Sequence, residues 1–243
     1  MRWGAMVLAF PMVLALSGCE RAPGARAAEG TAPRPDQMMD FKALYATNCQ
    51  ACHGANGHGG PAMELGNPEY QALVDDATLK KTISQGMRGT EMPAFAQTAG
   101  GMLTDAQVNA IVAGMRKEWA KPNVFGGAMP PPYQQPAGGD AKRGDQVYQA
   151  RCASCHQKPQ DQQVTSAVYL SLVSDQVLRT VIIAGRTDIG QPDWRLEPVS
   201  KGGVDVNAYY IPPLSRQDVT DIVTYLGSLR NPAVVSAAPT VGR

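Results

Sequence analysis

The sequence predicts an all-α protein made of two similar helical domains, and three observations support this prediction. Residues 76–86 recur as residues 175–185 at a constant offset of 99, which indicates an internal repeat. Apolar residues follow the helical period near the end of each copy. Runs that alternate between apolar and polar residues are nearly absent, so almost no strand is expected.

Each copy is expected to hold three helical segments. The candidates are 41–52, 68–85 and 104–118 in the first copy and 141–155, 167–184 and 215–229 in the second. Thr104 and Ser215 would cap the last segment of each copy, because their hydroxyl groups can accept from free backbone N–H groups of the first turn. An apolar stripe follows each cap, at Val108, Ile111, Val112 and Met115 and at Val219, Ile222, Val223, Leu226 and Leu229.

A segment rich in glycine and proline separates the two copies. Residues 122–139 contain three consecutive prolines at 130–132, which predicts a linker with a stiff centre. Domain one is therefore expected at 40–121 and domain two at 140–231. Residues 232–243 are expected to form a disordered tail.

The N-terminal segment is typical of an export signal. Residues 1–18 contain an apolar run that is too short to span a bilayer as a helix, and it ends in a Leu-Ser-Gly-Cys motif at Cys19. This ending resembles the lipobox of bacterial lipoproteins, which implies that Cys19 is lipidated and anchors the protein to a membrane. Residues 19–39 would then be a flexible tether. The alternative is ordinary signal cleavage after Ala27.

Charge and composition exclude some functions and favour a cofactor. The formal net charge is +1, and Lys+Arg against Asp+Glu number 6 and 8 over residues 40–120 and 10 and 10 over residues 140–230. Neither domain therefore offers the basic surface that nucleic acid needs. The chain has 25 glycines and 19 prolines, and small loop-rich domains usually need a staple such as a metal or a cofactor.

Each copy contains the pentapeptide Cys-x-x-Cys-His. The two occurrences are Cys49-Gln50-Ala51-Cys52-His53 and Cys152-Ala153-Ser154-Cys155-His156. In such a pentapeptide both thiols reach one edge of a porphyrin as thioethers, and the histidine points at the iron. The sequence therefore predicts two covalent haem c groups, one in each domain.

Three other uses of a cysteine pair explain the sequence less well. A zinc site needs four ligands around one metal, so both pairs would have to meet across the proline-rich linker. A redox pair of the thioredoxin kind needs a βαβ setting, which is missing. A disulfide within each pair fits an exported protein, but it leaves the two histidines and the downstream repeat without explanation.

On these motifs, residues 40–119 and 140–230 each resemble a class I cytochrome c domain. The chain as a whole thus resembles two such domains in tandem. The resemblance implies three or more helices around one haem in each domain, with the first and last helices crossing.

Aromatic residues at the crossing carry part of this resemblance. Tyr45 and Tyr148 match the aromatic residue of the first helix, and Tyr225 matches that of the last helix in domain two. Domain one has Gly114 at the last of these places. Trp119 is the candidate that would replace the missing aromatic ring.

The resemblance also implies a methionine as the distal iron ligand, on a loop before the last helix. Met92-Pro93 matches this pattern, so His53 and Met92 are expected to be the axial ligands of haem one. His58, in a nearby glycine-rich loop, is expected to be an exposed loop residue. The competing methionines, each more typical of a core or surface position, are Met63, Met87 and Met102.

Domain two departs from this pattern, so the two irons are not expected to be equivalent. Gln191 stands at the place of Met92, and no methionine follows Met129. With His156 as the proximal ligand, the iron of haem two is expected to be open or weakly ligated by Gln191. The alternative is a ligand from an insertion after Trp194, which contains Lys201, Asn207, Tyr209 and Tyr210.

Together these features predict an exported dihaem c-type cytochrome that carries single electrons on the periplasmic side of a bacterial membrane. Its redox partners would be a membrane respiratory complex or a periplasmic reductase, met through small transient interfaces. The alternative is a haem enzyme or gas sensor, such as a peroxidase, that works at an open haem two. The enzyme is the less favoured reading, because no obvious acid–base group stands beside a distal pocket.

Overall fold

The computed structural model describes residues 33–156, 162–196 and 212–230, and from Asp36 onward the protein forms one compact unit. These residues form α-helices and short 3-10 helices with no strand, and only two isolated β-bridges occur among them. The all-α prediction is therefore confirmed. The predicted signal segment, Cys19, the tail 232–243 and the four insertion residues (Lys201, Asn207, Tyr209 and Tyr210) lie outside the described residues.

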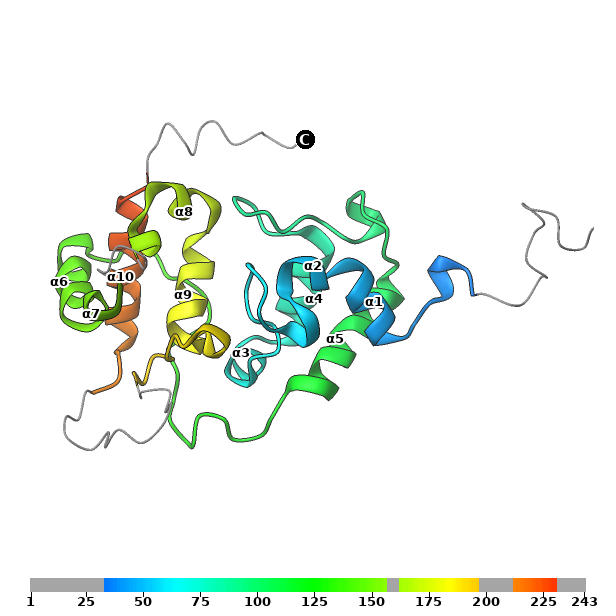
Figure 1. Ribbon diagram of the computed structural model, residues 1–243, viewed down its shortest axis with the longest axis horizontal. Helices are drawn as coiled ribbons and strands as arrows, with labels where there is room; N and C mark the ends of the chain where they lie inside the picture. The colour runs from blue at the N-terminus through cyan, green and yellow to red at the C-terminus, as the bar shows by residue number, and fades with distance from the viewer. Residues whose placement is uncertain (1–32, 157–161, 197–211, 231–243) are drawn as a thin grey trace, which may run out of the picture. The chain divides into compact units, whose positions relative to one another are not determined.

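Each half of the protein repeats one order of elements (Figure 1). The first half contains η1 (Pro35–Gln37), α1 (Phe41–Asn48), α2 (Gln50–His53), η2 (Ala55–Gly57), α3 (Pro68–Leu73), α4 (Asp76–Gln85), η3 (Gln97–Ala99) and α5 (Asp105–Trp119). The second half contains α6 (Ala141–Arg151), α7 (Ala153–His156), η4 (Gln162–Thr165), α8 (Ala167–Leu172), α9 (Asp175–Ala184), η5 (Thr187–Ile189) and α10 (Arg216–Ser228). In both halves a helix leads directly into the short helix of the Cys-x-x-Cys-His motif, and a long capped helix closes the half.

The predicted caps of the closing helices are confirmed. Thr104 accepts from the backbone N–H of Gln107, and the side-chain oxygen of Gln107 accepts from the backbone N–H of Thr104. Ser215 and Asp218 form the same reciprocal pair at the start of α10. Each of these capping boxes satisfies two N–H groups that a helix start leaves without partners.

Four of the predicted helices are each split in two. The segments 41–52 and 141–155 are interrupted at the first cysteine of each motif, Cys49 and Cys152. The segment 68–85 is divided into α3 and α4, because Asp75 accepts from the N–H of Thr78 and starts a new helix. Ser174 does the same for Val177 and separates α8 from α9. A short polar side chain offers the backbone this alternative bond, which favours a new N-cap over helix continuation.

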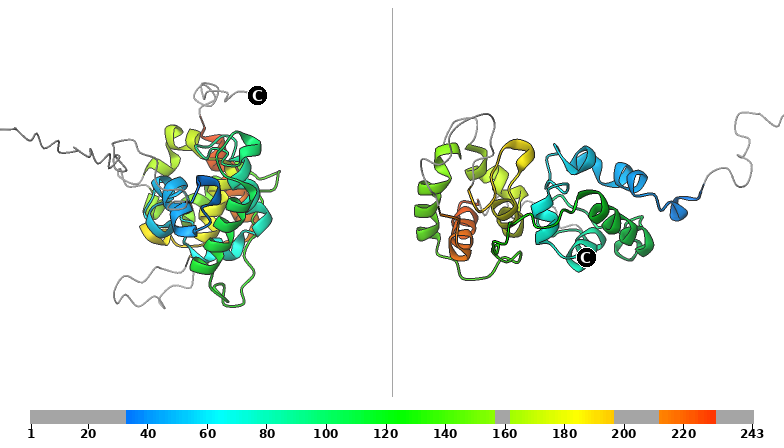
Figure 2. Two further views of the ribbon diagram at one scale, coloured as in Figure 1. Left: turned by 90° about the vertical axis from the view of Figure 1, so that its right-hand side faces the viewer. Right: turned by 90° about the horizontal axis from the view of Figure 1, so that it is seen from below.

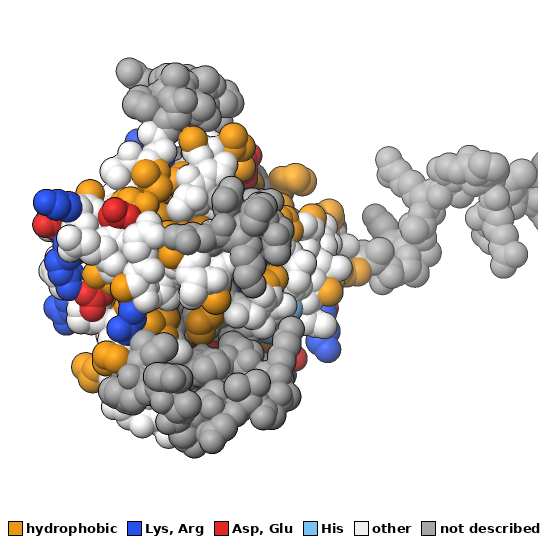
Figure 3. Space-filling view, turned by 60° about the vertical axis from the view of Figure 1, so that its left-hand side comes forward, with side chains coloured by type: hydrophobic (Ala, Val, Ile, Leu, Met, Phe, Trp, Pro, Cys, Tyr) orange, Lys and Arg blue, Asp and Glu red, His pale blue; other side chains and the backbone are white. Residues whose placement is uncertain are grey.

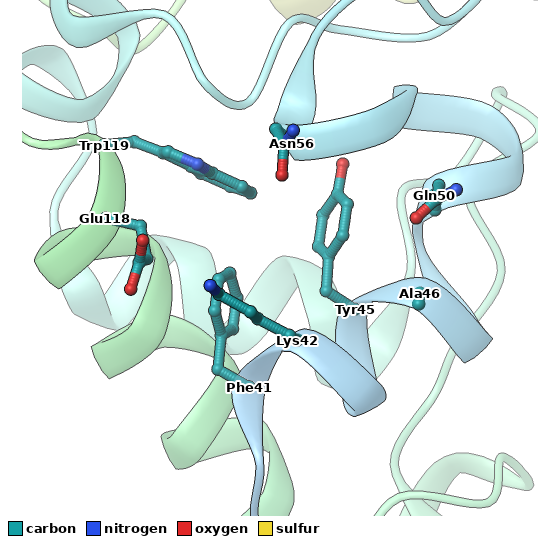
Figure 4. Close-up of a pocket in the computed structure, with 8 residues that line it drawn as sticks. All are labelled: Phe41, Lys42, Tyr45, Ala46, Gln50, Asn56, Glu118 and Trp119. Carbon is teal, nitrogen blue, oxygen red and sulfur yellow. The ribbon is translucent and has the colours of Figure 1, made fainter.

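The closing helix α5 packs on α1 through three aromatic rings. The ring of Trp119 meets that of Phe41 at 5.5 Å and that of Tyr45 at 5.2 Å, both edge to face. Figure 4 shows these rings around a pocket of about 190 Å³ that none of the motif cysteines or histidines lines. Trp119 thus supplies the aromatic contact on α5 that was expected of it.

Each helix crossing contains one glycine, which lies on the last helix in the first half and on the first helix in the second half. A Cβ atom at Gly114 of α5 would lie 2.1 Å from Cγ of Phe41, so the ring of Phe41 fills the place of a missing side chain. In the second half the glycine is on the first helix. A Cβ at Gly144 would lie 2.8 Å from Cβ of Tyr225 on α10, and Figure 2 shows α6 and α10 side by side. Large and small residues have therefore exchanged helices between the two halves.

The segment between the halves is bound to α9. The buried side chain of Arg179 donates from Nε to the carbonyl oxygen of Pro132 at 2.8 Å, and Gln176 donates to the carbonyl oxygen of Tyr133 at 2.6 Å. Burial lowers the pKa of Arg179 to about 10, which still leaves the guanidinium charged at neutral pH. The linker is thus held by a charge-assisted hydrogen bond as well as by its prolines.

No helix in the described parts of the chain is long and apolar enough to cross a membrane.

Candidate haem sites

The two Cys-x-x-Cys-His motifs have one backbone geometry. In domain one the N–H of Cys49 donates to the carbonyl of Tyr45, and the N–H groups of Cys52 and His53 donate to the carbonyl of Cys49. The corresponding bonds around Cys152 all recur, with its N–H donating to Tyr148. The first helix of each half therefore leads straight into a tight turn that presents two thiols and an imidazole from one short segment.

His53 is oriented by a second hydrogen bond. Its Nδ1 lies 2.7 Å from the carbonyl oxygen of Met63, which can only accept, so Nδ1 carries the hydrogen. Burial lowers the pKa of His53, which keeps the imidazole neutral at neutral pH. The lone pair of Nε2 is thus available to a metal, as is usual for a metal-binding histidine whose other nitrogen is held by a carbonyl.

The environment of the thiols fits a thioether better than a metal thiolate. Burial raises the pKa of Cys49 and of Cys152 to about 11 in each case. A zinc site or a reactive redox pair needs the opposite shift, because both use the thiolate. The first cysteine of each motif packs against the apolar core of its half, whereas Cys52 and Cys155 are exposed.

The loop that carries Met92 is closed by a left-handed turn. Gly86 ends α4 with φ 70°, and a Cβ atom there would lie 2.6 Å from the carbonyl oxygen of Met92. The N–H of Met87 donates to that same carbonyl at 3.0 Å. A side chain at Gly86 is therefore excluded, and the turn returns Met92 towards the end of α4.

The loop that carries Gln191 is built in the same way. Gly185 ends α9 with φ 75°, and a Cβ atom there would lie 2.8 Å from the carbonyl oxygen of Gln191. The N–H of Arg186 donates to that carbonyl at 3.0 Å, and the N–H of Gln191 donates back to Arg186 at 2.9 Å. Gln191 thus occupies in domain two the place that Met92 occupies in domain one.

The side chain of Gln191 faces the motif histidine. Its Oε1 lies 3.0 Å from Nε2 of His156, while its Nε2 donates to the carbonyl oxygen of Pro192. The amide is therefore oriented with its oxygen towards His156.

The loops of both halves end alike despite the insertion in domain two. Leu103 donates its N–H to the carbonyl of Phe95 at 2.7 Å, and Leu214 donates to Trp194 at 2.9 Å. Among the described residues, Nε1 of the buried Trp194 has no hydrogen-bond partner. That donor is free for a polar group of a cofactor, which fits a haem held under this loop.

The other candidate ligands lie in less suitable places. Met102 is 83% exposed, and Sδ of Met87 accepts from the hydroxyl of Ser174 at 3.7 Å. Met63 contributes its backbone carbonyl to His53, as described above. The insertion residues lie outside the described part of the chain.

His58 is exposed as expected, but it is not isolated. Its Nδ1 lies 2.7 Å from Oε1 of Glu64, whose side chain is fully buried. Glu64 belongs to no motif and lies on no apolar stripe, so nothing in the sequence pointed to it. It contacts the loop of Gln191 through Thr187, as detailed below.

The sequence matches two families of haem proteins, one in each half. Residues 36–113 match the family described as cytochrome c oxidase, cbb3-type, subunit III, and residues 141–230 match the family described as cytochrome c. These two regions contain the two Cys-x-x-Cys-His motifs and both loops.

Individual relatives share one or both regions. The chain is 39% identical over 90 residues to dihydro-heme d1 dehydrogenase of Pseudomonas aeruginosa, a match that covers 37% of this chain and 16% of that protein. It is 27% identical over 176 residues to the cbb3-type cytochrome c oxidase subunit FixP of Azorhizobium caulinodans, which covers 65% of this chain and 54% of that subunit. The chain thus spans about half or less of the curated relatives it matches.

A solved structure is similar over a third of the chain. The KustC0563 c-type cytochrome is 27% identical, and the match covers 34% of this chain and 99% of that one with a TM-score of 0.29. The score is too low for an argument about the fold.

Proposed function

The chain carries two cytochrome c domains in tandem with two covalently bound haem c groups, and we propose that it carries single electrons between a membrane respiratory complex and a redox partner outside the cytoplasm. The similarity to the two families indicates an electron-transfer c-type cytochrome. The observation that carries the proposal is that one compact unit contains two Cys-x-x-Cys-His turns with the same backbone bonds, each followed by a loop that begins with a glycine turn and carries Met92 or Gln191.

The motif residues would hold the haems. Cys49 and Cys52 would form the thioethers of haem one, and Cys152 and Cys155 those of haem two. His53 and His156 would be the proximal ligands, with the carbonyl of Met63 fixing the tautomer of His53. Each haem supplies an iron that exchanges one electron between Fe(III) and Fe(II).

Met92 and Gln191 would be the distal ligands. A thioether favours Fe(II) and raises the potential, whereas an amide oxygen is a harder and weaker donor. Haem one is therefore the site of higher potential. Haem two is the site at which an external ligand can displace the distal ligand. The similar loops around Gly86 and Gly185 support this assignment, because they place both side chains at one position.

The surface suits brief encounters rather than a permanent complex. The face in Figure 3 shows hydrophobic side chains in several separate groups, interspersed with polar and charged ones. Large exposed apolar residues of the second half include Val168, Leu172 and Ile189. Small apolar groups in a mixed surface are typical of redox partners that meet through small interfaces.

A lipid on Cys19 would keep the protein at the membrane. The Leu-Ser-Gly-Cys ending of the apolar N-terminal run supports this proposal. A multiply acylated N-terminus holds a protein stably, so residues 20–39 would act as a tether to the first domain.

Electron exchange and enzyme turnover can be separated directly. The purified haem-loaded protein is reduced with ascorbate and a mediator, then mixed with ferricyanide in a stopped-flow instrument, and hydrogen peroxide consumption is assayed in parallel. We expect rapid oxidation of both haems and no sustained consumption of peroxide. Sustained turnover that Gln191→Met abolishes would instead establish the haem enzyme working at haem two.

A further inference from the structure

A fully buried carboxyl group of domain one contacts the ligand loop of domain two. Oε1 of Glu64 accepts from the hydroxyl of Thr187 at 3.0 Å and lies 2.7 Å from Nδ1 of His58. The N–H of Asp188 lies 3.5 Å from the other oxygen, Oε2. Burial of a carboxyl group is costly unless its oxygens are hydrogen-bonded, so these contacts stabilise the arrangement.

The same loop is bound to the glycine turn that follows the first haem motif. Arg186 and Asp188 form an ion pair at 2.9 Å with side chains that are 12% and 6% exposed. Arg186 also donates to the carbonyl oxygen of Gly60 at 3.0 Å, and Asp188 accepts from the N–H of Gly59 at 3.0 Å. The ion pair thus satisfies both a donor and an acceptor of domain one.

A further bond fixes the start of the loop. The buried Asn67, which caps α3, donates from Nδ2 to the carbonyl oxygen of Ala184 at 3.1 Å. Ala184 is the last residue of α9 and directly precedes Gly185, where the ligand loop turns. Domain one therefore contacts the loop of Gln191 at Ala184, just before the glycine turn, as well as at residues 186–188.

The loop of domain one lacks the residues that make these contacts. At the offset of 99, Met87 stands in the place of Arg186, Arg88 in that of Thr187 and Gly89 in that of Asp188. The two loops share the glycine turn and the bond to the carbonyl of residue 92 or 191. They differ in the backbone between these points, since Thr187–Ile189 form η5 whereas Gly89 has φ 72°, and in the three side chains that bind across the domains. This difference indicates that only the loop of haem two is held by the other domain through these contacts.

We infer that Glu64 and Asn67 of domain one are positioning residues for the distal ligand of haem two. Together with Arg186, Thr187 and Asp188 they form what we call the interdomain cluster. The cluster holds the segment that is paired to Gln191 through the two backbone bonds with Arg186. This inference rests on the proposed role of Gln191 as the distal ligand.

The consequence is that residues of domain one help to hold the distal ligand of haem two in place. If the cluster loosens, Gln191 spends less time at the iron, and an external ligand enters more easily. Haem one keeps its own loop and its own ligand. A change in domain one therefore alters haem two more than haem one.

Glu64→Gln tests this across the domain boundary. The amide NH2 group cannot accept a hydrogen bond. At the place of Oε2 it would face the N–H of Asp188 and Nδ2 of Asn67, and at the place of Oε1 it would lose the contacts of Thr187 and His58, while the shape is kept. Thr187→Val removes the donor from the other side. The matched control is Glu118→Gln, an exposed residue of α5 in the same domain. All variants are purified with two haems per chain, and the rate of CO binding to reduced haem two and the EPR spectrum of the oxidised protein are measured.

We expect Glu64→Gln and Thr187→Val to speed CO binding at haem two roughly three- to tenfold, as loss of a buried hydrogen bond implies. The EPR signal of haem two should shift, and the near-infrared band of haem one should stay. Rates and signals equal to those of wild type and Glu118→Gln in both variants would overturn the inference. Gln191→Ala separates the two proposals: a changed EPR signal there with unchanged cluster variants refutes the cluster alone. An unchanged signal there with changed cluster variants refutes the assignment of Gln191 as the ligand, and with it the positioning of Gln191 by the cluster.

Discussion

At the scale of single residues, we propose that Met92 and Gln191 make the two haems differ. They sit at one position in loops that share a glycine turn and a closing backbone bond. The backbone turns of the two motifs are alike, since the same three bonds recur in both. We therefore expect the distal side chain to contribute most to a difference between the two irons.

Met92→Ala should remove the weak near-infrared band that sulfur-to-iron charge transfer gives the oxidised protein. It should also lower one reduction potential, because a ligand that favours Fe(II) is lost. Spectroscopy and potentiometry check both results. Met102→Ala is the matched control, because that side chain is 83% exposed and should change neither. A band that survives in Met92→Ala would assign the ligand to Met63 or Met87.

Gln191→Met should make haem two resemble haem one. The thioether should raise the lower potential and prevent CO from binding to reduced haem two. Gln146→Met, on the exposed side of α6, serves as the control for the added methionine. If Gln191→Met leaves CO binding unchanged, Gln191 is not at the iron. If Lys201→Ala or Tyr209→Phe then opens a haem two that was closed to CO, the insertion supplies the ligand.

At the scale of elements, the exchange of large and small residues at the helix crossings can be tested by substitution. Gly114→Ala should destabilise domain one by about 1–3 kcal/mol, because the added Cβ would overlap the ring of Phe41. The double variant Phe41→Gly/Gly114→Tyr puts glycine on the first helix and tyrosine on the last helix, as in domain two. It should recover part of the lost stability. Urea unfolding of the haem-loaded protein measures each change. Equal losses in the single and double variants would show that the two residues do not share this space.

The sequence predicted the helices that are strongly periodic or well capped, and it predicted less where short polar residues intervene. The closing helices and their caps at Thr104 and Ser215 agree with the structure within a residue. The segments 68–85 and 167–184 were expected to be continuous, and Asp75 and Ser174 divide them. A cap inside an otherwise helical pattern competes with continuation, and one sequence alone does not show which of the two prevails.

The motif side of each site was evident from the sequence, whereas the contacts between domains were not. Cys-x-x-Cys-His has fixed spacing, so it identifies its chemistry wherever it occurs. Glu64 and Asn67 meet the loop of Gln191 across more than a hundred residues of chain. Such a contact depends on how two folded domains pack, and no local pattern encodes it. The binding of the linker by Arg179 escaped prediction for the same reason.

At the scale of the whole molecule, we propose that a lipid on Cys19 attaches the protein to a membrane. Cys19→Ala should release the protein from membranes into the soluble fraction, since the acyl chains would be lost. Fractionation followed by haem staining measures this. Mass spectrometry of the wild-type N-terminus is the complement. A variant that stays in the membrane, with a wild-type chain that begins at Ala28, would show that the lipid proposal is wrong.

We expect one chain to carry two covalent haems of unequal potential that each exchange one electron. A redox titration of the purified protein, followed by optical and EPR spectra and repeated under CO, tests it most directly. The account predicts two one-electron steps, with the lower step belonging to the haem that binds CO and the higher step to the haem with the near-infrared band. A single potential for both haems, or two haems that both resist CO and give the same EPR signal, would contradict it.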